Sequence, residues 1–529
     1  MGESNHGTGV ACSRSRAARG RRLVARRRRS RSGRIALRFA ISNRCLAAAW
    51  TLAVAVAVLI PAGTLAAADR PTLSPVPILL DGSGAEHPAL VDDAADGGLL
   101  TVQAAAYADG LWLGLEFDAA VAADSGSGLV LHIDTDADPA TGDADGCDLV
   151  FDLQSRNGSL HPRRTLPGEG RLFSRLGIKV APTFESTSCE ILIPRKIRGG
   201  ESIFTGERLR FFVVYAGDRA PDAGFVGLPW TEHAAPVQRI ALARAPGSAL
   251  RIASWNIKRD GLFEEDSADA IARLLPVIDA DVLVVCESFR YDADEVLERV
   301  REISDSTGFM YARKADPGNV VLSRYPIPQW WSILDLPSRY NGHRGSAVLI
   351  DAPAGPIMVL PQHWRCCDKD GQRLYEADAL IGFLRDAFTE GGNFTLPREL
   401  PFVICGDLNL VTTRRPLDVV LTGEVVDKDS YGPDFAPGPG RTPLVAVPLR
   451  HSDAPLMHTW RQAESKYYPG RLDWVLVPSN VEVLRGFVLD TGTMFGQTLN
   501  EHGLDRRDSS VASDHGAIVV DVTWDGADQ

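Results

Sequence analysis

The alternation of apolar and polar residues changes its rhythm near residue 245. From Pro77 to about Ala243, short alternating apolar runs such as 111–117 and 210–215 are separated by Gly, Asp and Pro. A period of two residues is typical of half-buried strands, and no long helical period interrupts it. The pattern predicts an all-β sandwich domain over residues 69–245.

After the short linker-like segment 245–248, predicted strands alternate with predicted helices over residues 248–525. The run 282–285 is apolar on both faces, as expected for a central buried strand. Because sheets of this kind are covered on both faces, the pattern predicts a layered α/β domain. The other predicted strands are 250–257, 320–322, 346–351, 357–360, 402–405, 472–477 and 517–522, and the predicted helices are 267–278, 292–303 and 374–388. Ser267 is expected to cap the first helix, and Pro276 to kink it or end it early.

The first 68 residues have the pattern of an export signal. Thirteen arginines lie between Arg14 and Arg44, and no charge follows from Cys45 to Ala68. An apolar stretch, helix breakers and three alanines follow the basic head, so we predict cleavage after Ala68 and a secreted or periplasmic protein. The alternative is an uncleaved membrane anchor, because about 20 apolar residues can span a bilayer.

Composition adds two constraints. The chain has 529 residues, 45% of them hydrophobic, which is enough for two cores. The predicted signal carries a net charge of +12, so its removal changes the net charge from −12 to −24. An acidic surface disfavours tight, non-specific binding of duplex DNA but leaves small phosphoesters easy to accommodate.

Six of the eight cysteines remain after removal of the signal. Cys147 and Cys189 are the only pair in the sandwich domain, so a disulfide between them is one expectation and buried free thiols are the other. The remaining four, which allow three full pairings, are Cys286, Cys366, Cys367 and Cys405. Alternation along buried strands makes Cys286 and Cys405 core residues. The adjacent pair Cys366 and Cys367 forms either a disulfide to another segment or an unpaired, exposed pair.

An acidic run in the sandwich domain is a candidate calcium site. Asp134, Asp136 and Asp138 alternate at the end of a predicted strand, so their oxygens can converge on a hard cation such as Ca²⁺. A solvated acidic turn explains the run equally well. With its strands, this run resembles carbohydrate-binding modules of family 9, and the resemblance implies a carbohydrate ligand.

Polar residues at the ends of predicted strands in the second domain carry the chemistry. Strands that end at the same edge of a sheet present their side chains into a common crevice. We therefore expect these residues to form one site. Glu287, after the buried strand, is the expected primary Mg²⁺ ligand, with an exposed strand-terminal acid as the alternative. Asp407 and Asn409 alternate and are expected to point the same way, whereas Asp514 and His515 are adjacent and point apart. Asp473 is expected to hold the imidazole of His515.

Seven motifs in this order resemble the endonuclease/exonuclease/phosphatase superfamily of metal-dependent phosphoesterases over Leu250 to Trp524. They are Ser254-Trp255-Asn256-Ile257, Cys286-Glu287-Ser288, Val321 to Ile327, Gln362-His363-Trp364, Gly406-Asp407-Leu408-Asn409, Arg471-Leu472-Asp473-Trp474 and Ser513-Asp514-His515.

The resemblance implies a four-layer α/β sandwich. It also implies Asn256, Glu287 and Asp514 around Mg²⁺ or Mn²⁺, and His363 on the scissile phosphate. Asp407 and Asn409 would position the attacking water, and His515 with Asp473 would stabilise the transition state. Arg344 is a phosphate contact or a surface residue.

These observations predict an exported, divalent-metal-dependent phosphoesterase. Its substrate would be a nucleic acid, a phospholipid headgroup or another small phosphoester, and no obligate protein partner is expected. The alternative is a non-catalytic secreted protein that uses the sandwich domain to bind polysaccharide.

Overall fold

The structure is a computed structural model that describes residues 79–83, 89–92, 98–122, 128–161, 169–197, 200–333, 344–393, 395–462, 465 and 467–524. The predicted export signal and its cleavage site lie outside the described residues. Within the described residues, no helix has the length and apolar character that crossing a membrane requires.

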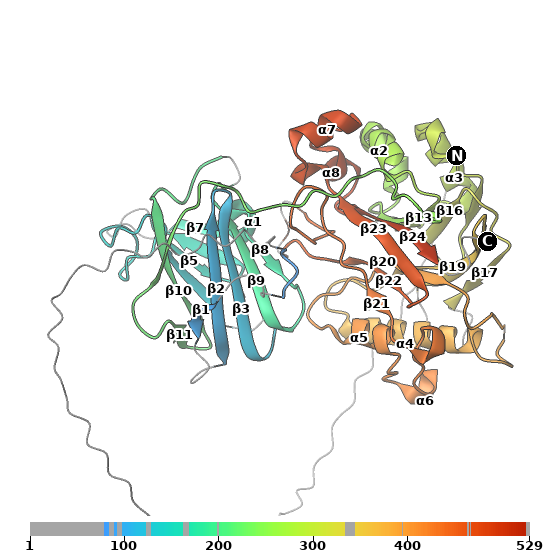
Figure 1. Cartoon of the computed structure of the whole chain (residues 1–529), viewed down its shortest axis with the longest axis horizontal. Helices are drawn as coiled ribbons and strands as arrows, with labels where there is room; N and C mark the ends of the chain where they lie inside the picture. The colour runs from blue at the N-terminus through green and yellow to red at the C-terminus, as the bar shows by residue number, and fades with distance from the viewer. Residues whose placement is uncertain are drawn as a thin grey trace, which may run out of the picture. The chain divides into compact units, whose positions relative to one another are not determined.

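The N-terminal part consists of two antiparallel sheets packed face to face (Figure 1). One sheet has the order β1-β2-β3-β9-β8, and the other has the order β11-β10-β4-β5-β6-β7, with β12 paired to β10. The core between them is built from alternate residues of both sheets, such as Leu113, Ile133 and Phe211. The predicted sandwich is therefore present. The elements are β1 (Ala89–Asp92), β2 (Leu99–Tyr107), β3 (Gly110–Val121), β4 (Val130–Asp134), β5 (Leu149–Asp152), β6 (Asn157–Leu160), β7 (Glu169–Leu172), α1 (Phe173–Leu176), β8 (Lys179–Ala181), β9 (Ser186–Pro194), β10 (Arg208–Tyr215), β11 (Asp218–Ala220) and β12 (Val226–Pro229).

The C-terminal part contains two mixed sheets of six strands each. Their orders are β15-β16-β14-β13-β24-β23 and β17-β18-β19-β20-β22-β21. The strands are β13 (Leu250–Asn256), β14 (Val282–Cys286), β15 (Tyr311–Arg313), β16 (Asn319–Ser323), β17 (Gln329–Ser332), β18 (Ser346–Ala352), β19 (Gly355–His363), β20 (Phe402–Asp407), β21 (Val445–Ala446), β22 (Asp473–Val477), β23 (Val481–Leu489) and β24 (Ala517–Trp524). All strands predicted for this part are present, and β23 is among those that the apolar pattern did not single out.

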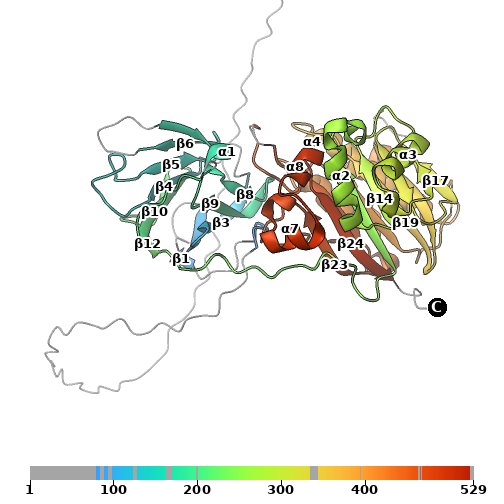
Figure 2. The ribbon, with the colours of Figure 1, turned by 90° about the horizontal axis from the view of Figure 1, so that it is seen from above.

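Helices cover the outer faces of both sheets, which makes four layers. The helices are α2 (Glu265–Ile278), α3 (Ala293–Ile303), α4 (Asp370–Ala387), α5 (Arg415–Thr422), α6 (Lys428–Tyr431), α7 (Gly496–His502) and α8 (Asp508–Ala512). Figure 1 shows α2 and α3 on one side of the paired sheets and α4 and α5 on the other, and Figure 2 shows α2, α3 and α8 together over the first sheet. A separate apolar cluster, which includes Val284, Val403 and Val520, fills the space between the two sheets. Residues 282–286 are buried throughout because both faces of β14 are covered.

Two helix starts illustrate what local sequence determines. Asp292 caps α3 in a complete capping box with Glu295, in agreement with the predicted helix at 292–303. The predicted range of α2 ended correctly at Ile278, but its predicted start and N-cap were wrong. The N-cap is Glu264, whereas Ser267 lies inside the helix and its hydroxyl donates to the carbonyl oxygens of Gly261 and Glu264.

Pro276 does not end α2, which continues to Ile278. The proline is exposed, so water can satisfy the backbone carbonyl that its missing N–H leaves free. The helix ends at Asp279, whose φ of 44° lies in the left-handed region.

The six cysteines in the described residues form no disulfide with one another. The expected Cys147–Cys189 disulfide is therefore absent, and both side chains are buried. Cys286 and Cys405 are buried on β14 and β20, as predicted. Cys366 and Cys367 are exposed and form no disulfide, and their Sγ atoms lie 2.7 Å apart.

Candidate active site

The directions of the strands bring the predicted site residues to one rim of the paired sheets. β13 and β14 run parallel, so Asn256 and Cys286 end side by side and Glu287 follows directly. β19 and β20 also run parallel and pair His363 with Asp407. β22 runs antiparallel to β20, so Asp473 lies opposite Asp407. β24 runs antiparallel to β13, and His515 lies two residues before it begins.

The centre of this rim is the carboxylate of Asp407, which is buried. Its Oδ2 accepts a hydrogen bond of 2.9 Å from Asn256 Nδ2. The same oxygen lies 3.8 Å from His515 Nε2 and 4.0 Å from His363 Nε2. Burial raises the pKa of Asp407 to about 7; His515 opposes the shift, and Asp473 adds to it. One carboxylate oxygen therefore lies between two imidazoles, on a group that titrates near neutral pH.

Asn256 links Asp407 to Glu287. Its Nδ2 also donates to Glu287 Oε1 at 3.2 Å, while its Oδ1 accepts from the backbone N–H of Lys258. The other Glu287 oxygen accepts from the backbone N–H of Arg259 at 2.8 Å. Glu287 has a φ of 63°, a backbone conformation that is uncommon for non-glycine residues and is found at functional sites. The carboxylate predicted as the metal ligand is thus held by two donors at the end of β14.

His515 is held by Asp473. Its Nδ1 lies 2.7 Å from Asp473 Oδ2, and both side chains are buried. Burial alone lowers the pKa of His515, but the Asp473 carboxylate, its hydrogen bond and the nearby Asp407 outweigh this effect and raise the pKa to about 10. At neutral pH this imidazole is therefore a cation with Nε2 directed toward Asp407.

His363 has the opposite electrostatic state. Burial lowers its pKa well below the ordinary value, and Arg344, His515 and Arg365 add to the shift. Its Nε2 lies 3.6 Å from Glu287 Oε1, and its Nδ1 lies 3.4 Å from Arg344 Nη1. The site thus contains one neutral and one protonated imidazole. The structure also places Arg344, which the sequence left between a phosphate contact and a surface residue, directly beside His363.

The prediction that Asp407 and Asn409 alternate along one strand was wrong. β20 ends at Asp407, and Asn409 has a φ of 49°, outside the extended region. The Asn409 amide donates to the backbone oxygen of Trp364 at 2.9 Å, and its backbone N–H donates to Asp407 Oδ1 at 2.8 Å. Asn409 therefore holds Asp407 through its backbone N–H.

Asp514 and His515 have different neighbours, as their adjacency predicts. Asp514 Oδ2 lies 3.8 Å from Nζ of Lys258, a residue that the sequence analysis did not single out. Of the three predicted metal ligands, Asn256 and Glu287 are in direct contact, and Asp514 lies against this lysine.

The donor set fits a hard divalent cation. Carboxylate and amide oxygens are the ligands that Mg²⁺ and Mn²⁺ prefer. Oxygens of Glu287 and Asp407 both converge on the amide of Asn256. Two carboxylates this close repel each other in a partly buried site, and a cation beside them would relieve that repulsion.

The sequence assigned no role to two residues that support the site. Thr459 Oγ1 accepts from the backbone N–H groups of Leu472 and Asp473, at 3.0 and 2.9 Å. Ser513 Oγ donates to the backbone oxygen of Asn256 and accepts from the backbone N–H of His515. Ser513 lies within the motif that contains His515, and this position was the only sign in the sequence that Ser513 supports the site.

The acidic run in the sandwich is arranged differently from the expectation. Carboxylate oxygens of Asp134, Asp136 and Asp148 lie close together. Asp148 directly precedes β5, and Asp138 is not part of this group. Asp134 already forms an ion pair with Arg210, and Asp138 Oδ1 accepts from the backbone N–H of Ala140. The sequence could not indicate Asp148, because pairing of β4 with β5 brings it there.

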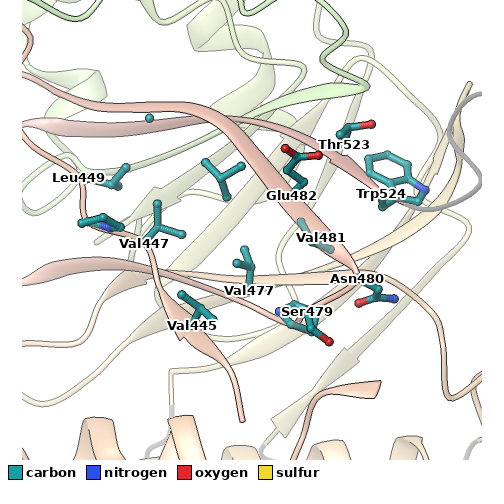
Figure 3. Close-up of a pocket in the computed structure, with 14 residues that line it drawn as sticks. Val445, Val447, Leu449, Val477, Ser479, Asn480, Val481, Glu482, Thr523 and Trp524 are labelled. Atoms are coloured by element: carbon teal, nitrogen blue, oxygen red, sulfur yellow. The ribbon is translucent and has the colours of Figure 1, made fainter. Parts of the chain in front are cut away.

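A pocket of about 860 Å³ lies away from this rim (Figure 3). It is lined where β22 and β24 end and β23 begins, around Val477, Trp524 and Val481. Asp473 and His515 lie at the other ends of β22 and β24. Among its described lining residues Glu482 is the one acidic side chain and there is no histidine, so this pocket does not have the cluster of carboxylates and imidazoles that the rim provides.

A model of the endonuclease/exonuclease/phosphatase family matches residues 253–515. The match begins three residues before Asn256 and ends at His515, so it spans every polar residue of the rim.

Solved structures with a similar fold cover 52% of this chain. Mannosyl-6-phosphatase Bt3783 of Bacteroides thetaiotaomicron VPI-5482 is 17% identical, is covered over 100% of its length and has a TM-score of 0.35. The catalytic domain of human Nocturnin is 15% identical, with 94% of it covered and a TM-score of 0.33. An endonuclease/exonuclease/phosphatase from Bacteroides vulgatus is 14% identical, with 99% covered and a TM-score of 0.36. The comparison with curated proteins found no match.

Proposed function

Because a model of the endonuclease/exonuclease/phosphatase family matches residues 253–515, we propose that the chain is an exported, divalent-metal-dependent hydrolase that cleaves phosphoester bonds by attack of water. One observation carries the proposal. Asp407 Oδ2 lies within 4.0 Å of Nε2 of both His363 and His515, and Asn256 joins it to Glu287. The family also favours an enzyme over the alternative of a non-catalytic binding protein.

Three side chains divide the work on a phosphoester. Asp407, with a pKa raised to about 7 by burial, accepts the proton of the attacking water. His515, protonated at neutral pH, donates Nε2–H to the oxygen on which negative charge develops. The neutral His363 offers a second contact to the phosphate from the opposite side of Asp407.

Mg²⁺ or Mn²⁺ would be held by Glu287 and Asn256, with Asp514 as the third predicted ligand. When bound, the ion supplies neutralisation of the phosphate oxygens, which lowers the barrier to attack by an anionic or partly deprotonated nucleophile. The residues of the chain then orient the phosphate and move the proton.

Two cations flank the site on the substrate side. Arg344 lies beside His363, and Lys258 lies beside Asp514. A single phosphate and one further anionic or polar group can satisfy them. Because the processed chain would carry a net charge of −24, a small phosphoester or a phospholipid headgroup fits better than duplex DNA. Nucleic acid is therefore the second candidate substrate.

The test is a substrate panel with the purified full chain. Bis-p-nitrophenyl phosphate, p-nitrophenyl phosphate, sphingomyelin and plasmid DNA are each assayed with Mg²⁺, with Mn²⁺ and with a chelator. We expect cleavage of at least one small phosphoester, loss of cleavage with chelator, and recovery on addition of metal. The proposal is wrong if none of the four is cleaved under any metal condition.

Export has its own test, because it concerns residues outside the described part of the chain. N-terminal sequencing of the protein recovered from the culture medium or periplasm is expected to begin at Asp69. A sequence that begins upstream of Cys45 would contradict cleavage and favour the membrane-anchored alternative.

A further inference from the structure

A second cluster of side chains that can bind a metal lies close to the proposed active site. His451, His458 and Asp490 are buried, and one ligand atom from each lies within 4.8 Å of the others. Asp490 Oδ2 is 3.9 Å from His451 Nδ1 and 4.0 Å from His458 Nε2. These separations are too long for hydrogen bonds. They exceed by only about 0.6 Å the spacing of ligand atoms around an ion bound at roughly 2.1 Å.

Asp490 Oδ1 and His451 Nε2, the atoms that would not bind the ion, are held by hydrogen bonds to other groups. Asp490 Oδ1 accepts from Arg461 Nη2 at 2.6 Å and from the backbone N–H of Gly492 at 2.9 Å, which leaves Oδ2 facing the two rings. His451 Nε2 lies 2.7 Å from the backbone oxygen of His458. Donation of Nε2–H to that carbonyl oxygen fixes the tautomer in which Nδ1 carries a lone pair. Nδ1 lies 2.9 Å from Thr493 Oγ1, and an ion bound at Nδ1 would replace this hydrogen bond.

His458 supplies an independent observation that points to a ligand. The residue is 8% exposed, and its Nδ1 is buried with no hydrogen-bond partner among the described residues. A ring nitrogen in this position is costly, because it has lost its water. With the ring proton on Nδ1, the lone pair of Nε2 faces the carboxylate of Asp490 at 4.0 Å, in a pocket that an ion can enter.

We infer that His451 Nδ1, His458 Nε2 and Asp490 Oδ2 bind a divalent transition ion of the zinc class, at a site separate from the proposed Mg²⁺ site. Two imidazoles and one carboxylate suit such ions, whereas Mg²⁺ prefers oxygen ligands. Arg461 and Lys179 lie nearby and oppose further positive charge. The site therefore depends on the affinity of imidazole nitrogen for the ion and not on net negative charge.

The ion would hold the segment that positions the catalytic pair. His458 is followed by Thr459, whose hydroxyl accepts from the backbone of Asp473 and whose carbonyl oxygen accepts from Gly516 N–H. Arg461, which holds Asp490, donates its backbone N–H to the carbonyl oxygen of Asp514. His458, Asp490 and Thr493 line the same pocket as Asp514 and His515, which gives the ion an entry path. The three ligands thus act as positioning residues.

The test measures metal content and not catalysis. The full-length protein is stripped with chelator, dialysed with a slight excess of Zn²⁺, freed of loose ion and analysed for zinc. We expect about one equivalent per chain for the wild type and at least a tenfold lower affinity for His458→Gln and for Asp490→Asn. His502→Gln, at an exposed histidine of α7, is the matched control and keeps the ion.

Two further arms separate this inference from the proposed function. Glu287→Gln is expected to keep zinc while needing at least tenfold more Mg²⁺ for half-maximal hydrolysis. Co²⁺ added to the stripped wild type is expected to give visible absorption bands that Zn²⁺ displaces, which decides the matter even if the variants fail to fold. The inference is overturned if the wild type retains no zinc and gives no cobalt spectrum, or if His458→Gln and Asp490→Asn fold and retain as much zinc as the wild type. Hydrolysis of the phosphoester panel would stand in either case.

Discussion

His515 Nδ1 and Asp473 Oδ2 lie 2.7 Å apart, although 42 residues separate them in the chain. The contact joins the two sheets, because Asp473 begins β22 of one and His515 precedes β24 of the other. Both groups are buried, so the hydrogen bond is charge-assisted and poorly screened by solvent. It keeps the imidazole protonated and directs Nε2 toward Asp407.

Replacing Asp473 by Asn tests this orienting role. We expect Asp473→Asn to lower kcat by roughly 10- to 100-fold, because an amide neither stabilises the imidazolium nor fixes the same ring state. KM should change less, since Asp473 does not face the substrate side. Steady-state kinetics on the best substrate of the panel, with circular dichroism as a check of folding, measure the effect. An unchanged kcat in a folded variant would remove Asp473 from the mechanism.

Asp407 is predicted to be the proton acceptor. Asp407→Asn is nearly isosteric and can keep the hydrogen bond from Asn409 N–H, but it cannot take up a proton from water. We expect turnover to fall by about 100-fold or more. Asp418→Asn, on the surface helix α5, is the control and should retain full turnover. Activity of Asp407→Asn within a few fold of wild type would show that another group accepts the proton.

Glu287 is predicted to set the metal requirement. We expect Glu287→Gln to need at least tenfold more Mg²⁺ for half-maximal activity, because a neutral amide is a weaker ligand for a hard cation. Titration of hydrolysis with Mg²⁺ measures this shift. Glu298→Gln, at an exposed position of α3, is the matched control and should give the wild-type titration curve. Coincident curves for all three proteins would exclude Glu287 as a ligand.

Glu376 on α4 makes stability depend on pH. Burial raises its pKa from 4.5 to about 7, although Arg365 N–H, which donates to Oε2 at 2.9 Å, opposes the shift. The folded chain therefore binds this proton more tightly than the unfolded chain. The resulting stabilisation is complete below about pH 4.5 and is lost as pH rises through 7.

Glu376→Gln cannot ionise, so it should avoid that loss. The Tm of the variant minus the Tm of the wild type is expected to be larger at pH 8 than at pH 5. The difference corresponds to at most about 3 kcal/mol, since one pKa unit is worth about 1.4 kcal/mol. Thermal unfolding at both pH values measures it, with Glu298→Gln as a control that should show no such change. A Tm difference independent of pH would mean that the carboxyl group is not protonated in the folded chain.

Local patterns identified the main strands and three helices of the C-terminal part. The apolar run at 282–285 predicted the buried strand β14, and the amphipathic pattern over 292–303 predicted α3. Pro276 was misjudged, because its tolerance depends on which side of the helix faces water. Sequence also could not show that Cys147 and Cys189 form no disulfide, since a disulfide depends on distance in space.

The site was predictable where a residue stands at a strand end and not where a loop bends. Glu287, Asp407 and Asp473 lie at the rim because parallel and antiparallel pairing aligns the strand ends. Asn409 lies outside the strand because its backbone leaves the extended region after Asp407. The His451, His458 and Asp490 cluster had no motif, because residues 451–458 meet Asp490 only through packing in space.

The most direct test of the central claim compares His515→Ala with His502→Ala in Mg²⁺-dependent hydrolysis of the small phosphoester that the wild type cleaves. The two variants remove the same side chain, one buried beside Asp407 and one exposed on α7. We predict that turnover falls by about 100-fold or more in His515→Ala and is unchanged in His502→Ala. Full turnover by folded His515→Ala would contradict the assignment of this rim as the active site.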